Sequence, residues 1–489
     1  MPPILVSFTR DKEVEMRHLS DRSAIADCPL CSYCLVVVAW GLALMFTGCV
    51  APPYPKQSLP KVKTPEEWSV NLSGVTNAFE GPWWERFKDP ELNRLIAGAL
   101  TANANLAVLA ERVELTRAEG RLNTAGARPR VSAGTGLRTG RQRTRATDYQ
   151  TESLKPMTAS SELVWEMDWL GKWRTRHTAA LERVRATEAD LNAGRLLLAA
   201  ETANAWFSIR RYNEDLGIIE DSIKHQNAIL TIYRDRLQAG LIDAAVIERQ
   251  AAEITILQRE LIQVQMLGET AVRRLDRLRG LPAGGSRYPI TPLRSGTIVI
   301  PILPAKLPAD ILRQRPDLAA AEARLRSAFA LERAAHLDLY PSLDLRLSGF
   351  TMTGSITDPF RSWMTEIGPR LEIPIWDPER IERLGSEQAR ARVVAAEYRA
   401  LALRAFEEVE TAAVQFNRRR EQLKLADEIV RKAEKIRKFT ADKLRVGLVS
   451  QLEVLEDERR ILTARRQSLA LHTELLADAV AIFRALGGP

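Results

Sequence analysis

The chain has 489 residues, of which 45% are hydrophobic and 27% charged, and its formal net charge at pH 7 is +8. This composition excludes a disordered chain and predicts a folded protein long enough for two or three domains. Acidic and basic residues are interspersed, as in Arg420 to Lys438, and no basic block is interleaved with aromatic residues, so the sequence argues against nucleic-acid binding.

The first predicted element is an apolar run over residues 35–49, preceded by several basic residues. At about 14 residues before its cysteine, it is shorter than a membrane-spanning helix and fits the core of a signal peptide. It ends in Phe46-Thr47-Gly48-Cys49, which resembles a bacterial lipobox. We therefore expect residues 1–48 to be a signal peptide and Cys49 to be the acylated mature N-terminus. An uncleaved anchor helix is the alternative.

All four cysteines lie within the first 49 residues. Cys28, Cys31 and Cys34 have a spacing that could bind a metal, but no further Cys or His ligand lies nearby. If the signal peptide is cleaved, all three are removed from the mature protein. We expect no metal and no cofactor other than the covalent lipid at Cys49. Val50 follows the cysteine where Asp often retains a lipoprotein at the inner membrane, which predicts sorting to the outer membrane.

The rest of the chain reads as an internal tandem repeat. Pro129 and Pro341 lie in similar surroundings 212 residues apart, and Gly240 and Gly447 lie 207 apart. The predicted organisation is a lipidated, extended N-terminal segment (49–82), a first repeat (83–282), a Pro-rich linker (283–304) and a second repeat (305–489).

Each repeat has the same predicted order. A helix of 30-odd residues ends near the proline, which cannot continue it. Two alternating strands follow, separated by a loop rich in Gly, Ser and Thr. A very long helix comes next, over residues 172–238 and 378–445, and a Gly turn leads to a return helix. A helix of 67 residues would be about 100 Å long, which indicates a coiled coil rather than a globular core.

The second strand of each repeat alternates apolar residues with charged ones, and the charged residues are Glu162, Glu166 and Asp168, then Glu366, Arg370 and Glu372. Such a strand fits an outer-membrane barrel, with its apolar face in lipid and its charged face in a watery lumen. Trp165, Trp169, Trp173 and Trp376 cluster near one end, as in an interfacial girdle. A soluble, half-buried hairpin is the alternative.

Four strands per chain cannot close a barrel, and open edges are not tolerated in lipid. The chain is therefore expected to share a barrel with sister subunits. Three chains would give twelve strands, although the residues alone leave that number open. We find no phosphate-binding loop, catalytic triad spacing or dinucleotide fingerprint, so we do not expect an enzyme.

Two longer stretches carry a family resemblance. WWERFKDPELNRLI (Trp83 to Ile96) and RPDLAAAEARLRSA (Arg315 to Ala328) are similar to signatures of the TolC-like outer-membrane efflux proteins, especially the lipidated members that serve RND-type pumps. The resemblance implies a mixed α and β membrane protein: a homotrimer whose twelve-stranded β-barrel continues into a long α-helical barrel across the periplasm. It also implies an equatorial belt, a periplasmic adaptor, an inner-membrane transporter that drives export, and passive conduction by this chain.

The resemblance also assigns roles at the far end of the long helices. Gly240, Leu241, Val446, Gly447 and Leu448 match the periplasmic turns where an adaptor docks. Glu453 and Glu456 match acidic residues that line the periplasmic aperture, and Arg249 could pair with a neighbouring helix to hold it closed. Read from the residues alone, the glycines are helix terminators and the glutamates belong to a solvated helix face.

Two other functions stay open at this point. A periplasmic or cytosolic coiled-coil scaffold would explain the helices but not the lipobox or the duplicated strands. A pump adaptor would need a compact β domain between two helical arms, and none is evident in the sequence. Neither the transported substrates nor the partner pump can be derived from this chain.

Overall fold

The computed structural model describes residues 54–55, 57–60, 62–65, 68–69, 82–137, 140–143, 151–154, 157–284, 286–288, 301, 308–353 and 362–488. Cys49 and the predicted signal peptide lie outside these residues, as does most of the linker. The chain divides into two units, Met1–Tyr54 and Pro55–Pro489. All helices and strands described below belong to the second unit.

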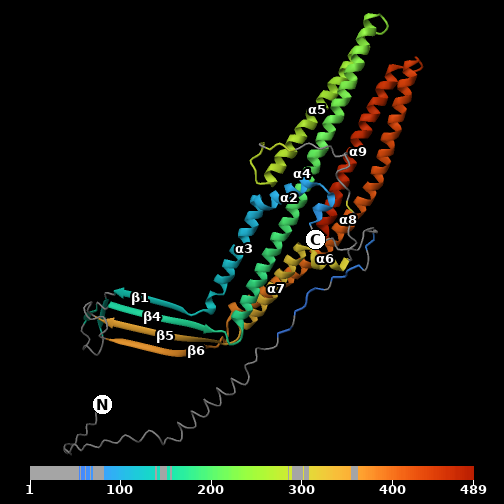
Figure 1. Cartoon of the computed structure of the whole chain (residues 1–489). Coiled ribbons are helices and arrows are strands. Elements are labelled where there is room, and N and C mark those ends of the chain that lie inside the picture. The colour runs from blue at the N-terminus through green and yellow to red at the C-terminus, as the bar shows by residue number, and fades with distance from the viewer. Residues whose placement is uncertain are drawn as a thin grey trace, which may run out of the picture. The chain divides into compact units, whose positions relative to one another are not determined.

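The first half begins with a short 3₁₀ helix, η1 (Trp83–Phe87), and the helices α2 (Pro90–Ala102) and α3 (Ala104–Asn123). A second 3₁₀ turn, η2 (Ala125–Ala127), leads to the strands. These are β1 (Arg130–Leu137), β2 (Gly140–Arg143), β3 (Thr151–Leu154) and β4 (Met157–Met167). The long helix α4 (Lys172–Gln238) and the return helix α5 (Ala244–Leu278) complete this half (Figure 1).

The second half has the same order of helix, paired strands, long helix and return helix. It consists of α6 (Pro308–Gln314), α7 (Pro316–Leu337), β5 (Ser342–Thr353), β6 (Trp363–Glu372), α8 (Pro378–Arg445) and α9 (Gln451–Ala485). The predicted bounds of both long helices agree with α4 and α8. The loop predicted between the first two strands instead contains the β2–β3 pair, which forms a separate two-stranded sheet.

The prediction of one unbroken helix before each proline is wrong. The chain is extended at Asn103 (φ −69°, ψ 122°) and at Arg315 (φ −73°, ψ 121°). The Asn103 side chain accepts the N–H of Leu106 at 2.9 Å and so caps α3. Arg315 precedes Pro316, and the proline ring disfavours a helical conformation at the residue before it.

The main sheet is antiparallel, with the strand order β1-β4-β5-β6. Its strands have 8, 11, 12 and 10 residues in that order, close to the 9–11 residues of a tilted membrane-crossing strand. Figure 1 shows the sheet at the ends of α3, α4, α7 and α8. In the described residues, β1 and β6 each have one edge without a partner strand.

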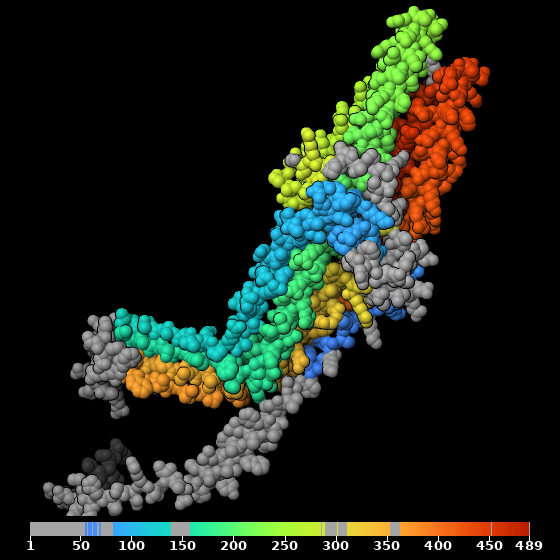
Figure 2. Space-filling view, viewed as in Figure 1, coloured from blue at the N-terminus to red at the C-terminus, as the bar shows by residue number. Residues whose placement is uncertain are grey.

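The helices form a layer in the same order as the strands. Next to the sheet, α3 contacts α4, α4 contacts α7, and α7 contacts α8. Farther from it, α5 contacts α4, α4 contacts α9, and α9 contacts α8. Figure 2 shows α3 and α5 on one flank of this layer and α8 on the other. Among the residues that the structure describes, no helix combines the length and apolar character needed to cross a membrane.

The core lies where η1 and α2 pack between the two long hairpins. Trp83 stacks on Phe483 with ring centroids 5.6 Å apart, and Phe87 contacts Phe207 at 5.2 Å. Asp89 caps α2 by accepting the N–H groups of Glu91 and Leu92. Its carboxylate also accepts hydrogen bonds from the buried guanidinium of Arg210 and the indole of Trp206, both at 2.8 Å. The buried charge of Asp89 is therefore fully hydrogen-bonded, as burial requires.

The described residues of the N-terminal segment lie against α7 and α8. Gln57 donates a hydrogen bond to the carboxylate of Glu332 at 2.5 Å. The backbone N–H of Ser69 donates to Glu410 at 2.8 Å, and the adjacent Trp68 packs on Phe406 with ring centroids 6.3 Å apart. These contacts attach the segment to the second half of the chain before the first helix begins.

Candidate functional site

The register of the main sheet separates its side chains into two faces. Because side chains alternate along a strand and align across it, Glu162 shares a face with its partner Ser348 and with Glu366 beyond. Glu166 likewise shares it with Asp344 and Arg370. We call this the polar face; its charged members are Arg130, Glu162, Glu166, Asp344, Arg346, Glu366, Arg370 and Glu372. Five of the six predicted lumen residues belong to it.

The opposite face of the sheet is apolar over its helix-proximal half. Its members are Val131, Leu163, Trp165, Leu343, Leu345, Leu347, Ile367 and Leu371. Val131 and Ile367 are more than 70% exposed, so no part of the described chain covers the outer strands of this face. An exposed apolar surface of this kind marks contact with a partner or a membrane.

The sixth predicted lumen residue, Asp168, is not a strand residue, because β4 ends at Met167. The Asp168 carboxylate accepts the N–H groups of Trp173 and Arg174, both at 2.9 Å. These are among the first N–H groups of α4, which have no partner within the helix. Gly171, at the N-cap position, has no side chain to satisfy them. Asp168 therefore caps the long helix.

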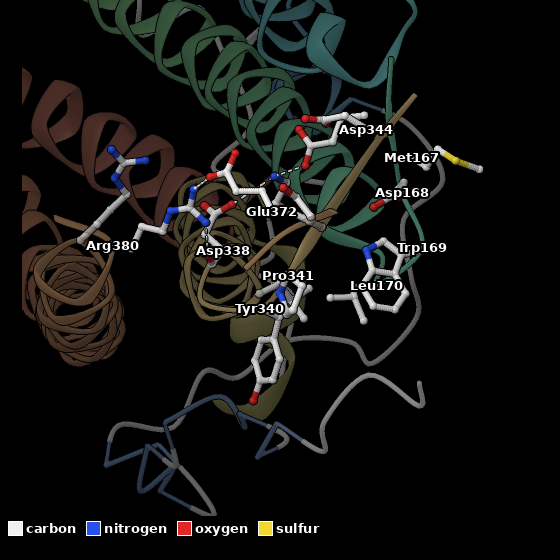
Figure 3. Close-up of a pocket in the computed structure, with 15 residues that line it drawn as sticks. Met167, Asp168, Trp169, Leu170, Asp338, Tyr340, Pro341, Asp344, Glu372 and Arg380 are labelled. Atoms are coloured by element: carbon white, nitrogen blue, oxygen red, sulfur yellow. Dashed lines mark hydrogen bonds and ion pairs between the residues drawn. The ribbon is translucent and has the colours of Figure 1, made fainter. Parts of the chain in front are cut away.

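A cavity of about 250 Å³ lies at the corner where the sheet meets the helices. Figure 3 shows Asp338, Asp344 and Glu372 on one side of it and Trp169 and Leu170 on another. Ion pairs cross the corner and join the two halves of the chain. Sequence reasoning missed this network, because its members come from segments far apart in the sequence.

The centre of the corner network is Asp338, in the turn after α7. Its carboxylate pairs with Arg176 at 2.6 Å and with Lys172 at 3.4 Å, and Lys172 also pairs with Glu166. Arg380 donates to the backbone carbonyl of Asp338 at 3.0 Å. The first turns of α4 and α8 are thereby fixed to the end of α7.

Arg380 also holds the other acid at the corner. Its guanidinium pairs with Glu372 at 2.8 Å and with Asp377 at 2.9 Å. Glu166 and Glu372, the last polar-face acids of β4 and β6, lie 206 residues apart, and each is paired with a cation from the helix that follows its strand. The corner network therefore fixes the angle between sheet and helices in both halves.

The four predicted girdle tryptophans have different environments. The indole N–H of Trp165 donates to the carbonyl of Ala127 at 3.1 Å, and Trp173 lies against Gly126, where a Cβ would be 2.4 Å from the ring. Trp169 and Trp376 are exposed. Trp165 and Trp173 therefore pack within the corner between sheet and helices. Of the four tryptophans, only Trp169 and Trp376 are exposed enough to contact a membrane interface.

The predicted tip turns lie at the far ends of the long hairpins. Gly240 and Gly447 have φ of 71° and 76°, a conformation that glycine adopts without strain. In each turn the residue after the glycine donates its N–H to the carbonyl five residues earlier, as in a Schellman motif: Leu241 to Arg236 at 2.9 Å, and Leu448 to Lys443 at 3.0 Å. The exposed side chains of Leu241, Val446 and Leu448 project at these ends.

Glu453 and Glu456 are both exposed and lie one turn apart on the first turns of α9. Glu453 also has a structural contact, because it forms a capping box with Ser450, with the reciprocal hydrogen bonds at 3.4 Å. Glu456 lies 3.7 Å from Arg460 on the same helix. Arg249 donates to the carbonyl of Ala245 within its own helix at 3.3 Å.

Two arginines of α9 join the hairpins of the two halves. Arg466 pairs with Asp215 of α4 at 2.7 Å and with Glu260 of α5 at 2.6 Å, and Arg459 bonds Glu253 of α5 at 2.8 Å. The α9 arginines and the α5 glutamates are each seven residues apart, so each pair occupies one helix face. The described residues contain no group of three or more His, Cys, Asp or Glu side chains that could hold a metal ion.

The sequence matches the model of one protein family, described as outer membrane efflux protein, over residues 95–281 and 307–488. The chain belongs to the outer membrane efflux protein family. The two matched segments cover most of both halves and leave out the N-terminal segment and the whole linker, so family membership rests on the sheet and helices described above.

Curated members of the family resemble the chain over almost its whole length. The pyoverdine export outer membrane protein OpmQ of Pseudomonas aeruginosa is 26% identical over 454 residues, which cover 91% of this chain and 95% of OpmQ. The cation efflux system protein CusC of Escherichia coli is 25% identical, with coverage of 95% and 99%. The probable outer membrane lipoprotein SilC of Salmonella typhimurium is 25% identical, with coverage of 91% and 96%.

Solved structures of outer-membrane channels share the fold. A crystal structure of CusC has a TM-score of 0.80 at 23% identity and covers 90% of this chain and 100% of its own. The outer-membrane channel OprN has a TM-score of 0.79 at 25% identity, with coverage of 88% and 99%. The resemblance to TolC-like efflux proteins inferred from the sequence is therefore confirmed, and the fold is that of the family's channels, mainly helical with a small sheet.

Proposed function

We propose that this family member is the outer-membrane channel of a tripartite efflux system and conducts substrates passively. In the proposed assembly, three copies build a twelve-stranded β-barrel that continues into a helical barrel across the periplasm. A lipid on Cys49 anchors each copy to the outer membrane of a Gram-negative bacterium. A periplasmic adaptor and an RND-type inner-membrane transporter deliver the substrates, and the chain itself is not an enzyme.

The observation that carries the proposal is the main sheet. One of its faces is apolar and uncovered, the other is charged, and both edge strands lack a partner in the described residues. The charged face is favourably solvated by water, and the apolar face is favourably solvated by lipid. Unpaired edges are costly in lipid, so the sheet is suited to closing a barrel with other copies of itself.

The internal repeat supports the proposed architecture. The long helices have 67 and 68 residues, and both return helices have 35. Two copies of one unit per chain, repeated three times around an axis, would place six similar units around one channel. The element order within the layer, with α3 and α5 on one flank and α8 on the other, lets one chain continue the wall begun by the next.

The proposed lumen would have a polar wall with nearly balanced charges. The polar face of each chain carries five carboxylates, from Glu162, Glu166, Asp344, Glu366 and Glu372, and three guanidinium groups, from Arg130, Arg346 and Arg370. Lys172 and Arg380 pair with Glu166 and Glu372, so the wall would be hydrated without a strong charge of either sign. At the periplasmic end, the exposed apolar residues of the two tip turns offer a docking surface for the adaptor.

Reconstitution tests the proposal directly. The acylated chain, extracted in detergent, is expected to be a trimer by native mass spectrometry and to form conducting pores in planar bilayers without any nucleotide. The scaffold alternative predicts a species that stays in the water-soluble fraction and leaves bilayers electrically silent. A detergent-dependent trimer without conductance would also rule out the channel.

A further inference from the structure

An open groove crosses the half of the main sheet that lies farthest from the helices. Its volume is about 550 Å³, and ligand-binding sites typically have about 300–1,000 Å³. Three neighbouring strands line it, with residues 159–161 of β4, 349–351 of β5 and 363–365 of β6. In Figure 1 these residues belong to the strand ends remote from α4 and α8.

A row of small residues across the sheet creates the groove. The register aligns the bulky side chains of Leu163, Leu347 and Ile367 on the apolar face. Two positions farther out, the next row on that face consists of Ala133, Ser161, Gly349 and Thr365. In the row beyond, Trp363 is 71% exposed. The surface is therefore low between the bulky aliphatic row and the Trp363 indole.

Gly349 keeps the middle of the groove open. A Cβ at this position would lie 2.9 Å from the hydroxyl oxygen of Ser161 and 3.9 Å from the methyl carbon of Thr365. Glycine weakens the interior of a strand, because it has no side chain to pack, and it often marks a place where another molecule approaches the backbone closely. The position of Gly349 in β5 is therefore better suited to a binding site than to sheet stability.

In the proposed barrel, the face that carries the groove meets lipid. Because the helices extend into the periplasm, the strand ends remote from them lie in the outer leaflet of the membrane. Unfilled space beside the sheet would lose dispersion contacts, so a lipid acyl chain is expected to fill it. The exposed Trp363 fits this depth, since tryptophan is enriched where a membrane meets water.

The groove also contains hydroxyl groups. Thr351 donates its hydroxyl to the carbonyl of Ser362 at 2.6 Å. Ser161 and Thr365 lie on either side of Gly349, and within the described residues neither hydroxyl has a hydrogen-bond partner. A hydroxyl that faces hydrocarbon without a partner is unfavourable. The best occupant is therefore an apolar chain that carries a polar group of its own.

We propose that the groove binds one acyl chain of an outer-leaflet lipid and selects a chain with a hydroxyl near its carbonyl end. Such hydroxylated chains are characteristic of the glycolipid in the outer leaflet of Gram-negative bacteria. The chain lies along the row of small residues, and its hydroxyl forms hydrogen bonds with Ser161 and Thr365. Trp363 packs against the carbonyl end of the chain. This inference rests on the proposed function, because it places this sheet face in the outer membrane.

A matched pair of phospholipids tests the selection. One probe carries two 3-hydroxymyristoyl chains and the other two myristoyl chains, on the same head group. Native mass spectrometry of the acylated trimer, titrated with each probe in detergent, is expected to show about tenfold stronger retention of the hydroxylated probe. That difference is the effect of one or two hydrogen bonds. Equal retention of the two probes would overturn the proposal and indicate boundary lipid without a specific site.

Two double variants separate the hydroxyls from the shape of the groove. Ser161→Ala/Thr365→Val keeps the groove open without the hydroxyls and is expected to retain both probes equally. Ser161→Leu/Thr365→Leu fills the groove and is expected to lower the retention of both probes at least tenfold. Thr135→Leu, on the same face but outside the groove, is the control and should match the parent chain. A preference that survives in the Ala/Val variant would contradict the role of the hydroxyls.

Photolabelling locates the bound chain without any substitution. The hydroxylated probe with a diazirine on its acyl chain is expected to label mainly peptides from β4 (Met157–Met167) and β6 (Trp363–Glu372). An excess of the unlabelled hydroxylated probe should suppress this labelling. Labelling spread evenly over all lipid-facing peptides would exclude a chain held in the groove.

The outcomes separate this inference from the proposed function. If the trimer forms and conducts ions, but shows neither chain selection nor localised labelling, the groove assignment is wrong and the channel stands. If the acylated chain forms no trimer that inserts into bilayers, this sheet face does not meet lipid and both proposals are wrong.

Discussion

At the scale of single residues, Glu453 belongs to the capping box of α9, and we propose that its charge also lines the periplasmic aperture. Glutamine keeps the capping acceptor but removes the charge, because the capping box accepts either residue. We expect Glu453→Gln/Glu456→Gln to lower the cation preference of the pore with no change in thermal stability, measured as reversal potentials in salt gradients. Glu453→Ala should lower stability by about 1 kcal/mol as well. Unchanged selectivity in the glutamine variant would remove both glutamates from the aperture.

At Gly280 the backbone of a neighbouring helix leaves no room for a Cβ atom. It has a φ of 69°, and a Cβ there would stand 2.1 Å from the carbonyl oxygen of Ala102. Gly280→Ala is expected to destabilise the chain by more than about 2 kcal/mol, from left-handed strain and the clash together. Gly217→Ala, in the open interior of α4, should instead gain up to about 1 kcal/mol. Denaturant unfolding measures the free energy of unfolding of both variants. Equal changes in the two variants would contradict the prediction.

Asp276 makes the stability of the chain depend on pH. Burial opposes its ionisation, but hydrogen bonds from the Tyr288 hydroxyl, Ser286 and the N–H of Gly284 outweigh burial and hold its pKa below the ordinary value. A lowered carboxyl pKa contributes stability above the unfolded-state pKa of about 4, and that stability is lost as the pH falls through the lower folded-state pKa. Unfolding measured from pH 7 to pH 3 should therefore show less pH dependence in Asp276→Asn. Tyr288→Phe, which removes one donor, should shift the loss to higher pH.

At the residue scale, the sequence correctly predicted which face of a strand a residue occupies, because that depends only on the alternation of side chains. Five of the six charged residues expected on one face of the strands share it, because side chains of a strand alternate strictly. Asp168 was wrongly predicted to be a lumen-facing strand residue. It caps α4, a role that depends on the path of the chain between the end of β4 and the start of the helix. Asp338 was missed because its partners Lys172 and Arg176 are more than 160 residues away in the sequence, and only the fold brings them together.

At the scale of elements, α4 depends on a cap from outside the helix. Asp168→Ala removes the acceptor of two N–H groups and is expected to cost about 1 kcal/mol, with fraying confined to the first turn of α4. Asp168→Asn keeps an acceptor and should recover most of the loss, apart from the pairing with Arg174. Hydrogen exchange of the Trp173 and Arg174 amides measures the effect. Equal protection in all three proteins would show that the corner network alone holds the helix start.

The elements themselves were largely predictable. The bounds of α4 and α8 follow from long charged helical patterns. Alternation predicts that β1, β4, β5 and β6 exist but not where they end, since β4 begins at Met157, before the predicted alternation, and ends at Met167, before Asp168. The break at Asn103 was missed because it lies within a continuous helical pattern. The break at Arg315 was overlooked although Pro316 marks it in the sequence, since a proline disfavours a helical conformation at the residue before it. A short polar segment such as β2, with its partner β3, carries no apolar alternation, so the sequence gives little sign that it forms a strand.

At the scale of the whole molecule, the proposed anchor is a single covalent bond. Cys49→Ser is expected to abolish labelling by radioactive palmitate and to lower the amount of trimer recovered from outer membranes several-fold, because acyl chains anchor the proposed trimer. The Cys28→Ser variant, altered within the predicted signal peptide, should label normally. Labelling that persists in Cys49→Ser would overturn the lipobox assignment.

The assembly was predictable only in outline. The strand count per chain and the alternation argue that sister subunits must complete a barrel, but they do not name the contacts. Such contacts depend on burial in the folded chain, in which equivalent positions of the two repeats can differ: Leu115 is exposed, whereas Ser327, 212 positions later, is buried.

The unpaired edges of β1 and β6 also bear on how a newly made chain reaches its destination. Until the other copies of the proposed trimer arrive, the described part of each monomer presents open hydrogen-bonding edges and an uncovered apolar sheet face to water, and such surfaces aggregate. Survival in transit therefore calls for either a holding chaperone or delayed folding of the strands. Overproduction that outpaces delivery should yield insoluble material even though every helix can form correctly.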